Sequence, residues 1–449
     1  MSAERWEGYS GFLLDMIRRE GCEIGDEVEV ERPDGSRFRG LLMSKTELSA
    51  DNVIVIKLPN GYNVGVALDP SSRLTRIAPG RRPAFTRPQT PPQRPDLPRV
   101  RVIGTGGTIA SRVDYRTGAV KPAISSEDLV SLVPELYEIA HVEAEVLLSV
   151  YSEDLTVREW GLIAERVYRV VSEGYAGVVL THGTDTMHYT AAALSFALQR
   201  PPVPIVLVGA QRSSDRPSSD AATNLIAAVQ TAAKAPFGAV VVAMHSWYSD
   251  DEIAIHRGTR VVKMHTSSRN AFRSVNASPL AVYREGSLRI LDNDYQPRAG
   301  DGPLYAPGFS DRAALVKFYP SMGPEILEYL ESRGYGGVVI EGSGLGHVAR
   351  SWIPVIRHLA DAGMFVGMCS QCRFGRTNMR VYNTGRDLLN AGVVQLEDML
   401  PEVALVKLMW TLHRARGLEE VRELMLRPIA GEIGGRTLPE VALHWTTRN

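Results

Sequence analysis

A glycine-rich segment near position 105 carries a hydroxyl group that could act as a nucleophile. The apolar run Val100–Gly104 leads directly into Thr105–Ala110, in which Gly106 and Gly107 precede Thr108. A short strand followed by two glycines exposes backbone amides and a side chain at the carboxyl edge of a parallel sheet. Thr108 is the side chain presented in this way, although an ordinary glycine turn has the same pattern.

A second segment places a hydroxyl group next to a carboxylate. The apolar run 177–180 continues into Thr181–Met187, where Gly183 is followed by Thr184 and Asp185 at the opening of a predicted helix. The glycine lets the backbone approach a ligand. An isolated aspartate at such a position is usually a helix cap, so this segment alone leaves the two interpretations open.

A lysine interrupts an apolar run further along the chain. Lys263 lies within Arg260–Thr266, between valines and a methionine. Lysine is rarely buried without a partner, so it either extends to solvent or serves a site. The presence of Thr108, Thr184 and Asp185 in the same chain favours a site.

Strand-like runs alternate with helical patterns from residue 100, which predicts an α/β domain with a doubly wound parallel sheet over 100–300. The predicted strands are Val100–Gly104, Ala144–Val150, Gly177–Thr181, Ile205–Val208 and Ala239–Ala243, and the predicted helices are Ser126–Leu132, Val157–Glu173, Met187–Leu198 and Asp220–Ala233. Ligands of such sheets bind beyond the carboxyl ends of the strands. We therefore expect the polar segments to meet there.

The alternation continues after residue 300, which predicts a second, smaller α/β domain over 301–449. Its predicted strands are Ala314–Phe318, Gly337–Ile340 and Phe365–Met368, and its helices are expected to begin at Pro324, Ser351 and Pro401. Glu341–His347 is rich in glycine but lacks the lysine of a nucleotide-binding loop. We expect a tight strand-to-helix turn there, near a domain or subunit contact.

Five short alternating runs in the first 78 residues predict a small all-β barrel. They are Gly25–Glu31, Phe38–Met43, Val53–Leu58, Tyr62–Ala67 and Leu74–Ile77, and they follow an amphipathic stretch at Phe12–Ile17. A sheet this small must curl to bury one face, as in SH3-like or Sm-like barrels. The barrel, over 1–78, has no catalytic pattern and is interpreted as structural or docking. The segment 79–99 is rich in proline and arginine, which predicts an extended linker.

Composition limits the class of protein. A chain of 449 residues is expected to form two or three domains, and a net charge of −1 gives no general attraction to nucleic acid or membranes. The charged amino terminus and the absence of a long apolar run predict a cytoplasmic protein.

Cys369 and Cys372 have no second pair to complete a zinc site, so we expect two buried or half-buried free thiols and no metal.

The three polar segments resemble, in order and spacing, the signature segments of the bacterial-type L-asparaginase and glutaminase family. The resemblance covers 100–449 and implies an asparaginase-like two-domain fold. It implies these roles: Thr108 as nucleophile, Tyr115 as the tyrosine of a mobile lid, Ser152 with Glu153 as the pair that binds the substrate's α-amino and α-carboxylate groups, and Thr184, Asp185 and Lys263 as a second catalytic set. The family more often has glutamine where this chain has Glu153.

This set of residues suits the hydrolysis of a side-chain amide. A threonine hydroxyl is a weak nucleophile and needs a proton acceptor. Thr184 hydrogen-bonded to Lys263, itself oriented by Asp185, would follow the logic of a hydrolase triad. Backbone amides of Gly107 or Gly183 would stabilise the oxyanion, each contributing about 10²- to 10³-fold. The products would be ammonia and an acyl-enzyme that water opens.

The amino-terminal barrel with its linker, and the polar segment Gln371–Arg386, resemble the D subunits of archaeal glutamyl-tRNA(Gln) amidotransferases. The resemblance implies an amidase subunit that takes ammonia from glutamine or asparagine, so that a partner E subunit can amidate Glu-tRNA(Gln). It also implies no cofactor in this chain, ATP and Mg²⁺ in the partner, tRNA held mainly by the partner, and a homodimer of this chain within a heterotetramer.

Two other hypotheses stay open. A stand-alone cytoplasmic L-asparaginase with an accessory barrel would hydrolyse asparagine rapidly without a partner. A catalytically silent scaffold, whose barrel docks a partner, would have no use for Thr108 and Lys263. The intact threonine and lysine positions disfavour the scaffold. The sequence does not choose between glutamine and asparagine as the ammonia donor, nor decide which threonine attacks first.

Overall fold

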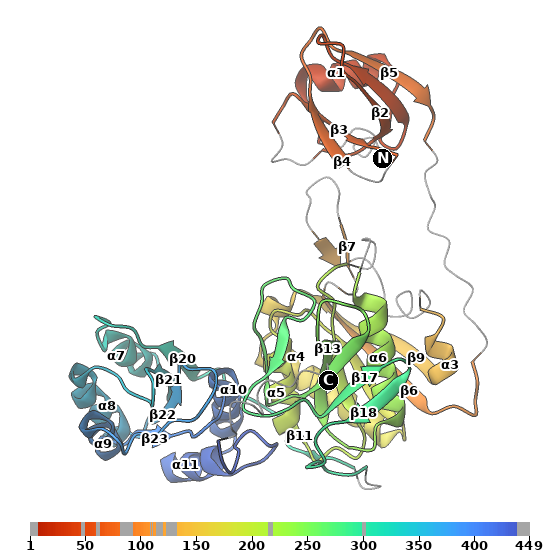
Figure 1. Cartoon of the computed structure of the whole chain (residues 1–449). Coiled ribbons are helices and arrows are strands. Elements are labelled where there is room, and N and C mark those ends of the chain that lie inside the picture. The colour runs from red at the N-terminus through yellow and green to blue at the C-terminus, as the bar shows by residue number, and fades with distance from the viewer. Residues whose placement is uncertain are drawn as a thin grey trace. The chain divides into compact units, whose positions relative to one another are not determined.

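The computed structural model describes residues 8–45, 50–59, 63–80, 93–107, 109, 111–113, 120–122, 133–213, 219–298 and 302–437. The chain divides into two compact units. One contains Met1–Pro88 and Ser111–Ala123, and the other contains Gln89–Ala110 and Ile124–Asn449. Figure 1 labels many of their elements.

The described residues of the first unit form helix α1 and a five-stranded antiparallel sheet. The elements are α1 (Gly11–Arg19), β1 (Glu27–Glu31), β2 (Arg37–Leu42), β3 (Val53–Lys57), β4 (Asn63–Ala67) and β5 (Arg73–Ala78), with strand order β4-β3-β2-β1-β5. The alternating side chains Val28, Val30, Ile54 and Ile56 pack with Leu13 of α1 in one apolar core. The prediction of five short antiparallel strands is confirmed. A further pair, β7 (Ser111–Val113) and β8 (Val120–Pro122), belongs to this unit.

The second unit is built around an eight-stranded sheet with the order β18-β17-β14-β13-β12-β10-β6-β9. Its strands are β6 (Arg99–Gly106), β9 (His141–Val150), β10 (Gly177–Thr181), β12 (Ile205–Val208), β13 (Val240–His245), β14 (Glu252–Arg257), β17 (Ala281–Arg284) and β18 (Ser287–Ile290). The five strands from β9 to β13 in this order are parallel, and β14, β17 and β18 are antiparallel. The parallel half was predicted, whereas the antiparallel extension was not.

Helices cover both faces of this sheet, as Figure 1 shows. They are α3 (Leu136–Ile139), α4 (Val157–Ser172), α5 (Met187–Ala197) and α6 (Ala221–Lys234). Val178 and Leu180 of β10 pack with α4 and α5, while Val179 packs with α6. Both faces of the central strands are therefore apolar, which explains their unbroken hydrophobic runs. The helix predicted at Ser126–Leu132 lies outside the described residues.

A smaller, parallel sheet follows in the same unit. It contains β20 (Ala313–Lys317), β21 (Gly337–Gly342), β22 (Phe365–Ser370) and β23 (Val394–Gln395), and its helices are α7 (Glu325–Ser332), α8 (Ile353–Asp361), α9 (Asn383–Asn390), α10 (Pro401–Leu412) and α11 (Leu418–Leu426). The prediction of a second, smaller α/β fold is confirmed. The helix expected from Ser351 starts with a 3-10 turn at Arg350–Trp352 before α8. Helix α10 packs against α5, with the rings of Trp410 and Phe196 6.1 Å apart.

Two further expectations about the smaller fold have different outcomes. Glu341–His347 contains a tight turn, closed by a hydrogen bond of 2.8 Å from the Ser343 amide to the His347 carbonyl oxygen. The prediction for the cysteines was half wrong, because Cys369 is buried but Cys372 is exposed. Cys369 ends the buried part of β22, and Cys372 follows in the loop beyond the sheet edge. In the described part of the chain, no helix is long and apolar enough to cross a membrane.

Candidate functional site

The carboxyl ends of three neighbouring strands meet at the centre of the large sheet. Strand β6 lies between β9 and β10, although β9 and β10 follow one another in the sequence. The strand order therefore reverses at β6, and such a reversal leaves a ligand-binding crevice beyond the carboxyl ends. The hydroxyl of Thr105 donates a hydrogen bond of 2.8 Å to the carbonyl oxygen of Thr181, which ties the end of β6 to the end of β10.

Close backbone contacts require glycine at the last residue of β6 and at the residue that follows it. Gly106 has φ +108 and Gly107 has φ +86, a region that residues with side chains rarely adopt. A Cβ atom on Gly106 would lie 2.3 Å from the Val150 carbonyl oxygen, and one on Gly107 would lie 2.3 Å from the Gly183 amide nitrogen. The backbones of the two motif segments are thus in direct contact, and Thr108 follows this contact point in the chain.

Lys263 binds the hydroxyl of Thr184 and the carboxylate of Asp185 in the second segment. It ends β15 (Val261–Lys263), which pairs with β16 (Phe272–Ser274). Its Nζ donates hydrogen bonds of 2.9 Å to Thr184 Oγ1 and 2.6 Å to Asp185 Oδ1. The side chain of Lys263 is 9% exposed and that of Asp185 is 69% exposed, so the ion pair lies at the rim of the site. The amino-terminal cap of α5 is Thr186, and the carboxylate of Asp185 is directed to the lysine.

Ser152 and Glu153 lie beside the same segment. They belong to the 3-10 turn Ser152–Asp154, which is separated by one residue from the end of β9. Ser152 is buried and its Oγ lies 3.4 Å from Glu153 Oε2, while its carbonyl oxygen accepts a hydrogen bond of 2.7 Å from Thr186 Oγ1. A Cβ atom on Gly183 would lie 2.7 Å from Ser152 Cβ. The absence of a side chain at Gly183 therefore allows the serine to approach the Thr184 segment.

Sequence reasoning did not identify the residues that support Thr184 from behind. Gly209 follows β12, and a Cβ atom there would lie 2.8 Å from Thr184 Cγ2 and 2.7 Å from Met187 Cε. The His182 amide donates a hydrogen bond of 2.9 Å to the Val208 carbonyl oxygen. The signal was present in the sequence, because Gly209 follows a predicted strand at the same sheet edge.

Two histidines near the segment are buried and held neutral. Burial lowers the pKa of His182 to about 4, and its Nε2 contacts Thr190 Oγ1 at 2.9 Å. Burial also lowers the pKa of His188 to about 4, and the nearby charge of Glu402 opposes this shift. Neither imidazole is positioned on Thr184 Oγ1, which accepts its hydrogen bond from Lys263. The charge next to this hydroxyl therefore comes from the Lys263 and Asp185 pair.

The structure thus brings together seven residues singled out from the sequence: Gly107, Ser152, Glu153, Gly183, Thr184, Asp185 and Lys263. Thr108 and Tyr115 lie outside the described residues. Among the residues that the structure describes, no group of three or more histidine, cysteine, aspartate or glutamate side chains is arranged to hold a metal ion.

Sequence profiles of three families match successive parts of the chain. The GatD N-terminal domain matches residues 22–76, the Asparaginase, N-terminal family matches residues 99–296, and the Glutaminase/Asparaginase C-terminal domain matches residues 312–425. The first match covers the five-stranded sheet except the last two residues of β5, the second covers the large sheet with the site, and the third covers the smaller sheet.

Curated relatives are similar over nearly the whole chain. The D subunit of glutamyl-tRNA(Gln) amidotransferase from Metallosphaera sedula is 48% identical over 96% of this chain and 97% of the relative. The proteins of the same description from Methanopyrus kandleri and Pyrococcus furiosus are 48% and 46% identical, each over 96% of this chain, and these matches cover 96% and 99% of the relatives.

Solved structures of L-asparaginases share the fold. The thermostable L-asparaginase of Thermococcus kodakarensis superposes with a TM-score of 0.67 at 34% identity, over 75% of this chain and 99% of that protein. L-asparaginase I of Vibrio cholerae superposes with a TM-score of 0.67 at 26% identity, with the same coverage.

Proposed function

This chain belongs to the family of glutamyl-tRNA(Gln) amidotransferase D subunits, and we propose that it releases ammonia from glutamine or asparagine for the amidation of Glu-tRNA(Gln) by a partner protein. The observation that carries this proposal is the full-length similarity to D subunits. That similarity extends through the amino-terminal module, which the GatD N-terminal domain profile matches at residues 22–76. The contacts of Lys263 with Thr184 and Asp185 support the hydrolytic part of the proposal.

The proposed reaction begins with attack of the Thr108 hydroxyl on the side-chain amide carbon of the donor amino acid. A bond forms between the threonine oxygen and the carbonyl carbon, the carbon–nitrogen bond breaks, and the hydroxyl proton leaves with the nitrogen as ammonia. Water then opens the ester, so the acid is released and the threonine recovers its proton. Ammonia is the product that the partner uses.

Thr184, Asp185 and Lys263 are assigned to the transfer of protons and to charge stabilisation. The Lys263 nitrogen lies 2.9 Å from Thr184 Oγ1, so its charge stabilises negative charge that develops on this oxygen. The Asp185 carboxylate, 2.6 Å from the same nitrogen, fixes its position. The backbone amide of Gly107 or Gly183 is assigned to the oxyanion of the tetrahedral intermediate.

Ser152 and Glu153 are assigned to the α-amino and α-carboxylate groups of the donor. Ser152 is buried beside Gly183, whereas Glu153 is exposed at the sheet edge. A carboxylate at position 153 attracts the positively charged amino group of the substrate. Tyr115 is assigned to a lid over the bound donor.

The partner E subunit is proposed to bind the tRNA, ATP and Mg²⁺, and to activate the glutamate. The near-neutral net charge of −1 supports this division, because strong tRNA binding needs a basic surface. We assign partner docking to the amino-terminal module, and we propose that this chain forms a homodimer within a heterotetramer. We propose a cytoplasmic location, because charged tRNA is used in the cytoplasm.

The decisive experiment measures ammonia release from glutamine and asparagine by the chain alone, with the tRNA-binding partner, and with both that partner and Glu-tRNA(Gln). Strong stimulation by the complex supports the amidotransferase function. Full activity of the chain alone, with no stimulation, would instead identify a stand-alone asparaginase. Thr108→Ala serves as the control, because it is expected to abolish ammonia release while the chain stays folded.

A further inference from the structure

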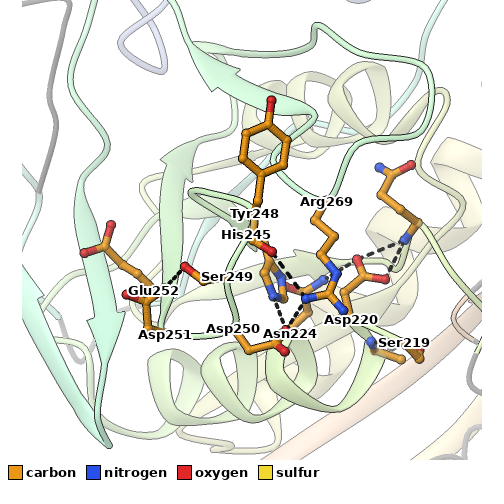
Figure 2. Close-up of polar contacts among 12 residues, drawn as sticks. Ser219, Asp220, Asn224, His245, Tyr248, Ser249, Asp250, Asp251, Glu252 and Arg269 are labelled. Atoms are coloured by element: carbon orange, nitrogen blue, oxygen red, sulfur yellow. Dashed lines mark hydrogen bonds and ion pairs between the residues drawn. The ribbon is translucent and has the colours of Figure 1, made fainter. Parts of the chain in front are cut away.

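A buried histidine at the end of β13 is part of a hydrogen-bond network that the proposed reaction does not use. His245 is fully buried, and its two ring nitrogens contact Asn224 Oδ1 at 2.7 Å and Asp250 Oδ1 at 3.0 Å. Figure 2 shows His245 beside Asn224 and Asp250, and the Arg269 guanidinium donates a hydrogen bond of 2.6 Å to the same Asp250 oxygen. The network joins three elements: the end of β13, the first turn of α6 and the loop before β14.

Asn224 connects this network to the segment behind Thr184. Its Nδ2 donates hydrogen bonds of 3.0 Å to the Gly209 carbonyl oxygen and 3.1 Å to Asp220 Oδ2. Gly209 lies against the Thr184 side chain, since a Cβ atom there would be 2.8 Å from Thr184 Cγ2. A shift of Asn224 therefore moves the peptide that supports Thr184.

Asp220, at the start of α6, also binds the segment 209–212 that lies behind Thr184. Its carboxylate accepts hydrogen bonds of 3.0 Å from the amides of Gln211 and Arg212, which follow Gly209 in the chain. The Asp220 side chain is fully buried, and Figure 2 shows it close to Asn224. Asp220 and Asn224 together hold residues 209–212, and Asn224 in turn is held by His245.

The orientation of Asn224 determines which proton His245 must carry. All three partners of Asn224 Nδ2, the Gly209 carbonyl oxygen, Asp220 Oδ2 and Met244 Sδ, are acceptors. Oδ1 is therefore the atom that faces His245, and Nδ1 of the imidazole must donate to it. At Nε2 the partner is a carboxylate oxygen of Asp250, so this contact is a hydrogen bond only when Nε2 is also protonated. Burial lowers the pKa of His245, and the hydrogen bond with Asp250 opposes this shift. The Asn224 contact persists in both protonation states.

We propose that His245 is a positioning residue for amide hydrolysis, which holds Asn224 so that Gly209 keeps Thr184 in place beside Lys263. This inference rests on the proposed role of Thr184. The residue acts through Asn224 and Gly209 and does not touch the substrate. Its loss therefore affects the chemical step more than the binding of the donor, which is assigned to Ser152 and Glu153 on a different loop.

Three substitutions at position 245 separate positioning from general stability. His245→Leu removes both contacts, His245→Asn keeps an amide nitrogen close to the position of Nδ1, and His245→Gln places one close to the position of Nε2. The complex of this chain with its tRNA-binding partner is assayed for ammonia release from glutamine, and folding of each variant is followed by hydrogen exchange of β12 and β13. Asp250→Asn is the matched control, because it changes the opposite side of the imidazole.

We expect His245→Leu and His245→Gln to lower kcat by about 10- to 100-fold with KM within about twofold of wild type. His245→Asn and Asp250→Asn are expected to keep kcat within about threefold, since the contact with Asn224 remains. A folded His245→Gln variant with wild-type kcat, or a His245→Asn variant as impaired as His245→Gln, would overturn the proposal even if His245→Leu does not fold. A wild-type complex that releases no ammonia would instead overturn the proposed function on which it rests.

Discussion

Gly107→Ala is predicted to impair catalysis strongly, because the added methyl group has no space. The new Cβ atom would lie 2.3 Å from the Gly183 nitrogen and 2.5 Å from the Gly183 Cα, and ordinary contact begins at 3.4 Å. Both obstructing atoms are backbone, so the two segments must separate by about 1 Å, a displacement that costs on the order of 100-fold in rate when it misplaces reacting groups. The φ of +86 at Gly107 adds about 1–2 kcal/mol of strain for alanine.

The assay compares kcat for ammonia release by Gly107→Ala and by Gly161→Ala. Gly161 lies in α4, has no atom within 4 Å of the added Cβ and has no positive φ. We expect kcat to fall about 100-fold in Gly107→Ala, and Gly161→Ala to keep wild-type activity with about 1 kcal/mol of added stability. A Gly107→Ala variant within about threefold of wild-type kcat would refute the argument that the two backbones meet at this position.

Four other predictions concern the catalytic lysine, the amino-terminal module, the buried histidines and a buried ion pair. Lys263→Met removes the charged donor at Thr184 Oγ1 and is expected to lower kcat by at least about 10³-fold. The far-ultraviolet circular dichroism should stay unchanged. Residual activity near that of the wild type would contradict the proposed role of Lys263. Deletion of residues 1–78 is expected to leave asparaginase-type hydrolysis in place but to weaken partner binding, and calorimetry that finds unchanged affinity removes the docking role. Burial lowers the pKa of His182, His188 and His256 to about 4, 4 and 3, so on acidification the unfolded chain takes up protons that the folded chain excludes. From about pH 7 to about pH 5.5 the free energy of unfolding should fall by about 4 kcal/mol in urea titrations, and a flat profile argues against three neutral buried imidazoles. Lys407→Met leaves the fully buried carboxylate of Glu432 without its ion-pair partner and should lower the free energy of unfolding by about 3–5 kcal/mol. In a double-mutant cycle, the double variant with Glu432→Gln should recover part of this loss.

The sequence alone determined the local parts of this protein. The parallel strands β10 and β12 were predicted with their observed ends, Gly177–Thr181 and Ile205–Val208, because unbroken apolar runs mark strands buried on both faces. The helix following Asp185 was found from its apolar pattern. Thr108, Thr184 and Asp185 were identified because glycine, threonine and aspartate at a strand end leave a local signature that does not depend on distant partners. Tyr115, Ser152 and Glu153 were identified only through the family resemblance.

Some errors came from surroundings that no local pattern contains. The antiparallel strands β14, β17 and β18 were missed, since their pairing with β13 is a tertiary choice. The exposure of Cys372 was misjudged because the chain leaves the sheet edge just before it. The importance of Gly209 and Asn224 was not recognised, because their effect depends on what lies behind Thr184.

Tertiary structure alone decided how the polar groups are combined. Lys263 lies 78 residues after Asp185 in the chain, yet its nitrogen reaches both Thr184 and Asp185. Ser152 lies beside the segment of Thr184 because β9 and β10 flank β6 on opposite sides and end at the same edge. Sequence determines which side chains are available and which strand ends present them, since these depend on neighbouring residues. Distances between those side chains depend on strand order, which only the folded sheet establishes.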